Sequence, residues 1–172
     1  MLGPIADRRR IRIVVNAVDA SCWVRADRQR FKQVVVNLVA NAVKFNTDGG
    51  EVCIDGERRP NEHFRLSISD TGPSIADSDI GRLFQPFERL AADQTQIEGT
   101  GLGLALSKHL MTAMAGEIGV TSHSGTGSTF WIEFPITAEP SLTPSDRLDD
   151  LIEPAAVPRP PSDPSTQQSP RL

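Results

Sequence analysis

The chain has 172 residues, 38% of them hydrophobic, which suffices for one domain with a buried core, and its formal net charge is −4 with a pI near 5.4. That acidic balance argues against a nucleic-acid partner, because nucleic-acid-binding surfaces are usually basic. No apolar run reaches the roughly 20 residues needed to cross a bilayer, and Cys22 and Cys53 fit no metal-ligand spacing. Free cysteines are typical of a reducing compartment, so we expect a cytoplasmic chain without direct membrane contact.

The first segment, residues 1–10, is polar and ends in three arginines. We expect it to be the solvated end of a linker; binding of something acidic is the alternative. Residues 12–15 and 23–24 then predict two short strands. Asp27 is a suitable N-cap for a helix that ends near Asn46, because apolar residues recur behind it at helical spacing: Phe31, Val34, Val35, Leu38, Val39 and Ala42.

Asn37, Asn41 and Lys44 fall on one stripe of this predicted helix, beside its apolar face. Two amides and an ammonium group on one side of a helix can bind a metal ion and phosphates. The alternative is a solvated helix face, which is the usual role of such a stripe.

A hairpin is predicted next, with strands at residues 51–57 and 64–69 and a turn between them. Apolar residues alternate along the second strand, so Asp70 continues its inward side. A buried carboxylate needs a donor, and the exocyclic amine of a nucleotide base would serve. The alternative is a turn aspartate before Thr71 and Gly72.

Residues 99–103 read GTGLG and precede an apolar run at 104–114. A glycine-rich turn that opens a helix presents unpaired N–H groups, which suit phosphate oxygens; a plain tight loop is the alternative. The helix is expected to end at Gly116 and to bury one apolar stripe, made of Leu106, Leu110 and Met114.

A second hairpin is predicted at residues 117–122 and 128–134, with Phe130, Ile132 and Phe134 pointing inward. Residues 138–172 hold eight of the 13 prolines and few aliphatic side chains. Such a segment buries too little apolar surface to offset the entropy of ordering, so we expect a disordered tail.

Taken in order, the segments NLVANAVKF, DTGPSI, LFQPFERL, GTGLGLALSKHL and GTGSTFWIEF resemble the N box, first glycine box, F box, second glycine box and final strand turn of a known family. That family is the catalytic and ATP-binding domain of sensor histidine kinases, within the Bergerat or GHKL ATP-binding superfamily. The resemblance covers about residues 11–135. It implies an α+β fold, a two-layer sandwich with helices on one face of a mixed sheet, as a domain of residues 11–137.

The resemblance also implies roles for individual residues, with ATP and Mg²⁺ as ligands. Asn41 resembles the magnesium-ligating asparagine, Asp70 the aspartate that binds the adenine amine, and Arg89 a lid arginine that reaches the terminal phosphate. The implied catalytic set is Asn37, Lys44 and Arg89. The implied nucleotide-binding set is Asn41, Phe45, Asp70, Gly72, Gly99, Thr100, Gly101, Leu102, Gly103 and Thr129.

One position departs from the family pattern D-x-G-x-G, because Ser74 replaces the second glycine. If that position needs a positive φ, serine costs about 1 kcal/mol or more. We therefore expect a strained backbone at Ser74 and weakened nucleotide binding.

The expected function is the ATP-binding half of a protein-histidine kinase. Related ATPases carry a water-activating glutamate where this chain has Asn37, and an amide cannot act as a general base. Transfer to a histidine on a separate dimerisation and phosphoacceptor domain is expected instead, with a response regulator as the indirect partner. None of His63, His109 and His123 has the setting of a phosphoacceptor. A non-catalytic nucleotide-binding module is the alternative, and a serine kinase of anti-sigma type is less favoured.

Overall fold

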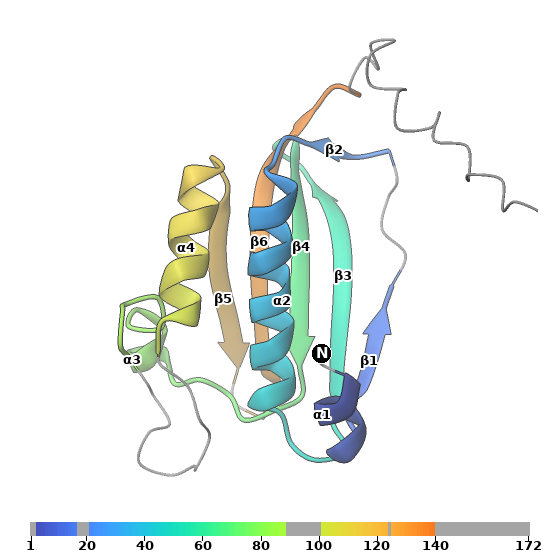
Figure 1. Ribbon diagram of the computed structural model, residues 1–172, viewed down its shortest axis with the longest axis vertical. Coiled ribbons are helices and arrows are strands. Elements are labelled where there is room, and N and C mark those ends of the chain that lie inside the picture. The colour runs from blue at the N-terminus through green and yellow to red at the C-terminus, as the bar shows by residue number, and fades with distance from the viewer. Residues whose placement is uncertain (1–2, 17–20, 89–100, 124, 140–172) are drawn as a thin grey trace, which may run out of the picture. The chain divides into compact units, whose positions relative to one another are not determined.

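The computed structural model describes residues 3–16, 21–88, 101–123 and 125–139 (Figure 1). Within this part, β1 pairs with β3 in parallel, and β3, β4 and β6 follow one another as antiparallel neighbours. β5 and the short β2 pair along successive parts of β6. The strands are β1 (Arg12–Val15), β2 (Trp23–Val24), β3 (Glu51–Arg59), β4 (His63–Asp70), β5 (Glu117–His123) and β6 (Gly127–Thr137).

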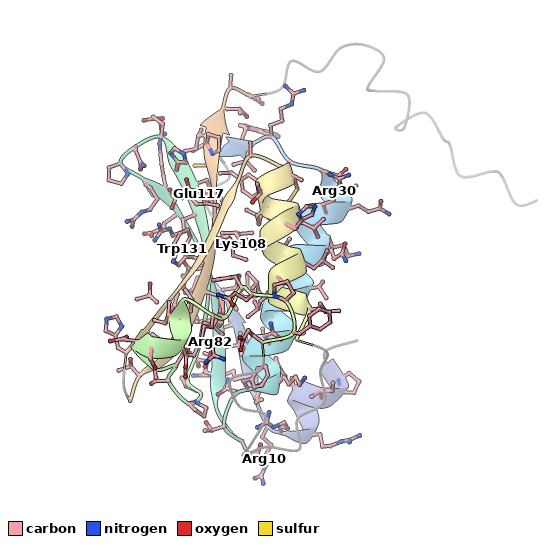
Figure 2. The ribbon with its side chains drawn as sticks, turned by 90° about the vertical axis from the view of Figure 1, so that its left-hand side faces the viewer. Arg10, Arg30, Arg82, Lys108, Glu117 and Trp131 are labelled. Carbon is pink, nitrogen blue, oxygen red and sulfur yellow. The ribbon has the colours of Figure 1, made fainter. Side chains whose placement is uncertain are left out.

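The helices are α1 (Gly3–Arg8), α2 (Arg28–Lys44), α3 (Asp77–Ile80) and α4 (Gly103–Ala113). α2 and α4 lie side by side on one face of the sheet (Figure 1), and Figure 2 shows Trp131 on the opposite face. This is the two-layer α+β sandwich that the sequence predicts, and both predicted hairpins are confirmed. The predicted tail lies outside the described residues from position 140 onward.

The core lies between the sheet and the two long helices. Even-numbered residues of β4 and β6 face the helices, and Ile68, Ile132 and Phe134 are almost completely buried. The apolar stripe of α2 packs on them through Val34, Leu38, Val39, Ala42 and Val43. Burying one such side chain contributes about 1.5–3 kcal/mol, so this packing fixes which face of each strand points inward.

The N-terminus of α2 is capped as the sequence predicts. The Asp27 side chain accepts a hydrogen bond of 2.9 Å from the backbone N–H of Arg30, which satisfies one of the unpaired donors of the first turn.

The C-terminus of α2 is held by Arg9, and here the structure differs from the sequence prediction. The Arg9 guanidinium donates to the carbonyls of Val43 at 2.9 Å and Lys44 at 2.7 Å, and also to that of Asn46. It pairs with Asp48 at 2.8 Å. Residues 1–10 were expected to be a solvated linker, but residues 3–8 form α1 and bury Ala6. Arg9, directly after α1, supplies donors that the last carbonyls of α2 need.

The predicted stripe of α4 is confirmed in part, because Leu110 and Met114 pack against the core. Ser107 and Met111 are the buried residues, whereas Leu106, expected in the core, is 45% exposed. The helix packs on both α2 and β5, and that position turns Leu106 outward.

The end of α4 is closed by Ala115 rather than by Gly116. Ala115 adopts a left-handed φ of 56°, and the N–H of Gly116 bonds the carbonyl of Met111 at 2.9 Å, as in a Schellman motif. Gly116 is needed for space, since a Cβ there would lie 2.6 Å from atoms of Met111 and Phe134.

Replacing Ala115 by glycine should therefore stabilise the domain. Relief of the left-handed strain exceeds the entropy that glycine adds to the unfolded chain, so we expect about 0.5–1 kcal/mol more free energy of unfolding. Urea denaturation measures the change. Ala113→Gly, within the right-handed last turn of α4, is the control and should lower stability by about 1 kcal/mol. If Ala115→Gly lost as much stability as the control, left-handed strain at Ala115 would be contradicted.

Candidate functional site

Asp70 ends β4 on the face that the helices cover and is only 8% exposed. Its Oδ1 accepts a hydrogen bond of 2.9 Å from the backbone N–H of Gly72. Burial raises the pKa of the Asp70 carboxyl above its ordinary value, while the N–H groups of Gly72 and Ser128 oppose that rise. A carboxylate can accept about four hydrogen bonds, so this buried group can also accept one from a ligand amine.

Gly72 brings the segment after Asp70 against the end of α2. A Cβ at this position would lie 2.7 Å from the Phe45 carbonyl oxygen and 2.9 Å from Asp70 Oδ1. Only glycine fits such an approach. The structure thus places Asp70 beside the C-terminal turn of α2, where Lys44 and Phe45 lie.

Thr129, predicted to line the adenine end, points to the other face of the sheet. Its Oγ1 lies 2.9 Å from the hydroxyl of Ser69, since alternate residues of a strand face opposite sides. Ser128, directly opposite Asp70 in the β4–β6 pairing, is buried on the helix side. Sequence reasoning missed Ser128, although the inward assignment of Phe130 already implied it.

Asn37 meets the start of α4. Its Nδ2 donates to Ser107 Oγ at 2.9 Å, and a Cβ on Gly103 would lie 2.6 Å from Asn37 Oδ1. The structure therefore brings together Asn37 from the N box and Gly103 from the second glycine box. Ser107, which sequence reasoning did not single out, holds the Asn37 amide.

Asn41 and Lys44 follow Asn37 along α2, at the end of the helix nearer Asp70. The Lys44 ammonium lies 5.3 Å from the centre of the Phe45 ring, and Phe45 is 42% exposed. An exposed aromatic ring beside a cation offers a flat surface next to a positive charge.

Gly101 and Phe87 touch through their backbones. Gly101 has a φ of 70°, a Cβ on it would lie 2.9 Å from the backbone of Phe87 and Glu88, and its carbonyl accepts the N–H of Phe87 at 3.1 Å. Phe87 itself has a φ of 65° and is 75% exposed. Leu102 follows, partly exposed, before α4 begins. The predicted site residues Arg89, Gly99 and Thr100 lie outside the described residues.

Ser74 is not strained. Its φ is not positive, so the expected cost of replacing glycine does not arise. Its hydroxyl instead bonds two backbone groups of the β5–β6 turn.

A magnesium site here would rest on amide oxygens and phosphates. In the described part of the chain, no three His, Cys, Asp or Glu side chains gather as a metal centre. Mg²⁺ commonly takes one or two protein oxygens and completes its octahedron with water and substrate phosphates. The amide oxygens of α2 fit that mode of binding.

A groove of about 590 Å³ runs between α2 and α4. Asn37, Gly103 and Ser107 line it together with apolar side chains that include Val36 and Leu106. Asp70 does not line this groove.

The family model described as histidine kinase-, DNA gyrase B- and HSP90-like ATPase matches residues 26–138. The chain belongs to this family. It is 40% identical over 139 residues to the sensor histidine kinase GacS of Pseudomonas protegens, a match that covers 77% of this chain and 15% of GacS. The chain thus spans a small part of that curated relative.

Solved structures of histidine kinases also resemble this chain. Full-length ShkA in complex with AMPPNP superposes with a TM-score of 0.69 at 33% identity, covering 81% of this chain and 28% of ShkA. The catalytic domain of the histidine kinase ThkA, in a nucleotide-free form, gives a TM-score of 0.65 at 27% identity, covering 78% of this chain and 84% of that domain. Among the described residues, no helix combines the length and apolar character needed to cross a bilayer.

The raised pKa of Asp70 predicts how stability depends on pH. The folded chain holds the proton of the Asp70 carboxyl more tightly than the unfolded chain does. The contribution of this group to the free energy of unfolding is therefore complete below the unfolded pKa, about 4. That contribution is lost as pH rises through the folded pKa. Relative to Asp70→Asn, the wild type should lose stability as pH rises from acid towards neutral.

Urea denaturation of both proteins across this pH range provides the test. Ser69→Ala is the control, because it changes the residue next to Asp70, on the face of the sheet away from the helices, and removes no titratable group. Its stability should differ from that of the wild type by an amount that does not depend on pH. A wild type that gains stability over Asp70→Asn as pH rises would contradict the assigned direction.

Proposed function

We propose that the chain is the ATP-binding catalytic domain of a two-component sensor histidine kinase. It transfers the γ-phosphate of ATP to a histidine on a separate dimerisation and phosphoacceptor domain. The observation that carries the proposal is the buried Asp70 carboxylate, which Gly72 brings close to the end of α2, the turn of the chain that carries Lys44 and Phe45. Family membership and the likeness to histidine kinases support it.

The base and the phosphates of ATP are bound by different parts of the chain. The Asp70 carboxylate accepts a hydrogen bond from the adenine amine, and Phe45 lies beside the nucleotide. Lys44 neutralises phosphate charge, and the N–H groups at the start of α4, with Gly99, Thr100, Gly101, Leu102 and Gly103, cradle the phosphates. The Asn41 amide oxygen would hold the Mg²⁺ that accompanies ATP, and the ion would supply further charge neutralisation.

The transfer step needs an imidazole from outside the described residues. A nitrogen of that imidazole bonds the γ-phosphorus as the bond to the β–γ bridging oxygen breaks, and ADP leaves with the electron pair. Arg89 stabilises the charge on the transferring group. Asn37, whose amide has no proton affinity for water activation, disfavours hydrolysis.

The histidines of the described part do not suit the acceptor role. The His63 ring bonds the Asn61 carbonyl at 2.8 Å in the β3–β4 turn, His109 lies exposed on α4, and His123 ends β5. The acceptor domain therefore comes from a longer parent chain or a partner chain, with a response regulator next in the relay. ATP as the phosphoryl donor implies action in the cytoplasm.

Binding of Mg-ATP is the first test. Asp70→Asn and Asn41→Ala should each weaken the affinity at least about tenfold, because each removes a hydrogen bond or ligand that the site cannot replace. Calorimetric titration measures this, with Asp55→Asn on the open face of the sheet as the matched control. Wild-type affinity in both site variants would refute the assignment of Asp70 and Asn41 to the nucleotide site.

Phosphoryl transfer in trans is the second test. The chain alone should incorporate no label from radiolabelled ATP and should hydrolyse it slowly. A dimerisation domain from a related kinase should become labelled when the chain is added, and the label should be lost in acid, as for phosphohistidine. Stable label on this chain alone would exclude the proposed division of roles. Failure with every matched acceptor would favour the alternative, a non-catalytic nucleotide-binding module.

A further inference from the structure

Ser74 bridges two backbone groups of the turn between β5 and β6. Its hydroxyl donates to the His123 carbonyl at 2.7 Å and accepts the N–H of Gly125 at 3.0 Å. Both partners are about 50 residues away in sequence. The hydroxyl therefore joins two distant segments, which a glycine at this position would leave unlinked.

Ser122 makes a second link beside the first. Its Oγ accepts the N–H of Ile75 at 2.8 Å, donates to the Gly127 carbonyl at 3.0 Å, and lies 3.1 Å from the Ser128 hydroxyl. Ser122 and Ser128 are both buried. Consecutive residues 74 and 75 are thus each fastened to the hairpin by one serine hydroxyl.

The same turn lies directly against the backbone of Asp70. A Cβ on Gly127 would lie 1.9 Å from the Asp70 carbonyl oxygen, and Gly127 has a φ of 90°, so only glycine is accommodated. The backbone N–H of the next residue, Ser128, lowers the pKa of the Asp70 carboxyl against the effect of burial. The hairpin therefore touches the carboxylate itself as well as the segment that leaves it.

We propose that Ser74, with Ser122, is a positioning residue for the base-binding end of the site, because the two hydroxyls clamp the chain that leaves Asp70 to the β5–β6 turn. This inference rests on the proposed function, since it assumes that Asp70 binds adenine. In this view serine at position 74 replaces the freedom of a glycine with a fixed attachment, and that attachment favours the binding-competent arrangement of Asp70 and Gly72 before nucleotide arrives.

The clamp predicts a specific pattern of ligand affinities. Loss of the Ser74 hydroxyl removes two hydrogen bonds of ordinary strength, which should weaken binding roughly three- to tenfold. Since the clamp acts at the base, adenosine and Mg-ATP should weaken by the same factor. Lys44→Ala, at the phosphate end, should weaken Mg-ATP far more than adenosine.

The experiment compares Ser74→Ala, Ser74→Gly and Ser74→Thr with wild type. Calorimetric titration with adenosine and with Mg-ATP gives the affinities, and thermal denaturation reports on folding. Ser69→Ala is the matched control, because it removes a serine hydroxyl that bonds β6 on the opposite face of the sheet. Hydrogen exchange at the Gly125 amide reports the clamp without any ligand and should quicken in Ser74→Ala.

Equal weakening of both ligands in the alanine and glycine variants, recovery with threonine and no change in Ser69→Ala would support the clamp. Wild-type affinity in Ser74→Ala, whether or not its melting temperature falls, would overturn the clamp while leaving the proposed function intact. Tighter binding by Ser74→Gly would overturn it as well. A wild-type chain that binds neither ligand would refute the proposed function and this inference together.

Discussion

The pairing register of β4 with β6 determines which side chains the helices cover. Ile68 stands opposite Phe130, and two residues on, Asp70 stands opposite Ser128. The apolar pairs must face α2 and α4 to form the core, and strand alternation then carries Asp70 to the same face. A shift of one residue would move both the core and the carboxylate into solvent. The stability of the core and the position of the candidate base-binding group therefore depend on the same backbone hydrogen bonds.

Glycines of the sequence boxes mark places where backbones or side chains of this chain meet one another. Gly72 meets the end of α2, Gly101 meets Phe87, and Gly103 meets the Asn37 side chain. The space that a glycine leaves is thus partly filled by the protein itself, and the glycine pattern reflects the closeness of α2, α4 and the loops as much as it reflects phosphate.

Local features were predictable and long-range ones were not. Asp27 caps α2 because its side chain reaches a donor three residues away, and both hairpins join neighbouring strands. Ser74 was misjudged because its partners lie on the distant β5–β6 turn, and Leu106 because α2 and β5 together determine the buried side of α4. Strand alternation predicted the inward position of Asp70, and the family resemblance gave Asp70 its role. The resemblance also assigned Thr129, where strand alternation favoured Ser128.

Arg9 and β1 precede the part of the chain that matches the family, which begins at residue 26. A fragment cut at that boundary would leave the last carbonyls of α2 without the guanidinium that now binds them. It would also expose the edge of β3, because the N–H and C=O groups along that edge now pair with β1. An open strand edge is a template for other chains, so such a fragment should aggregate even though every sequence box of the family is retained.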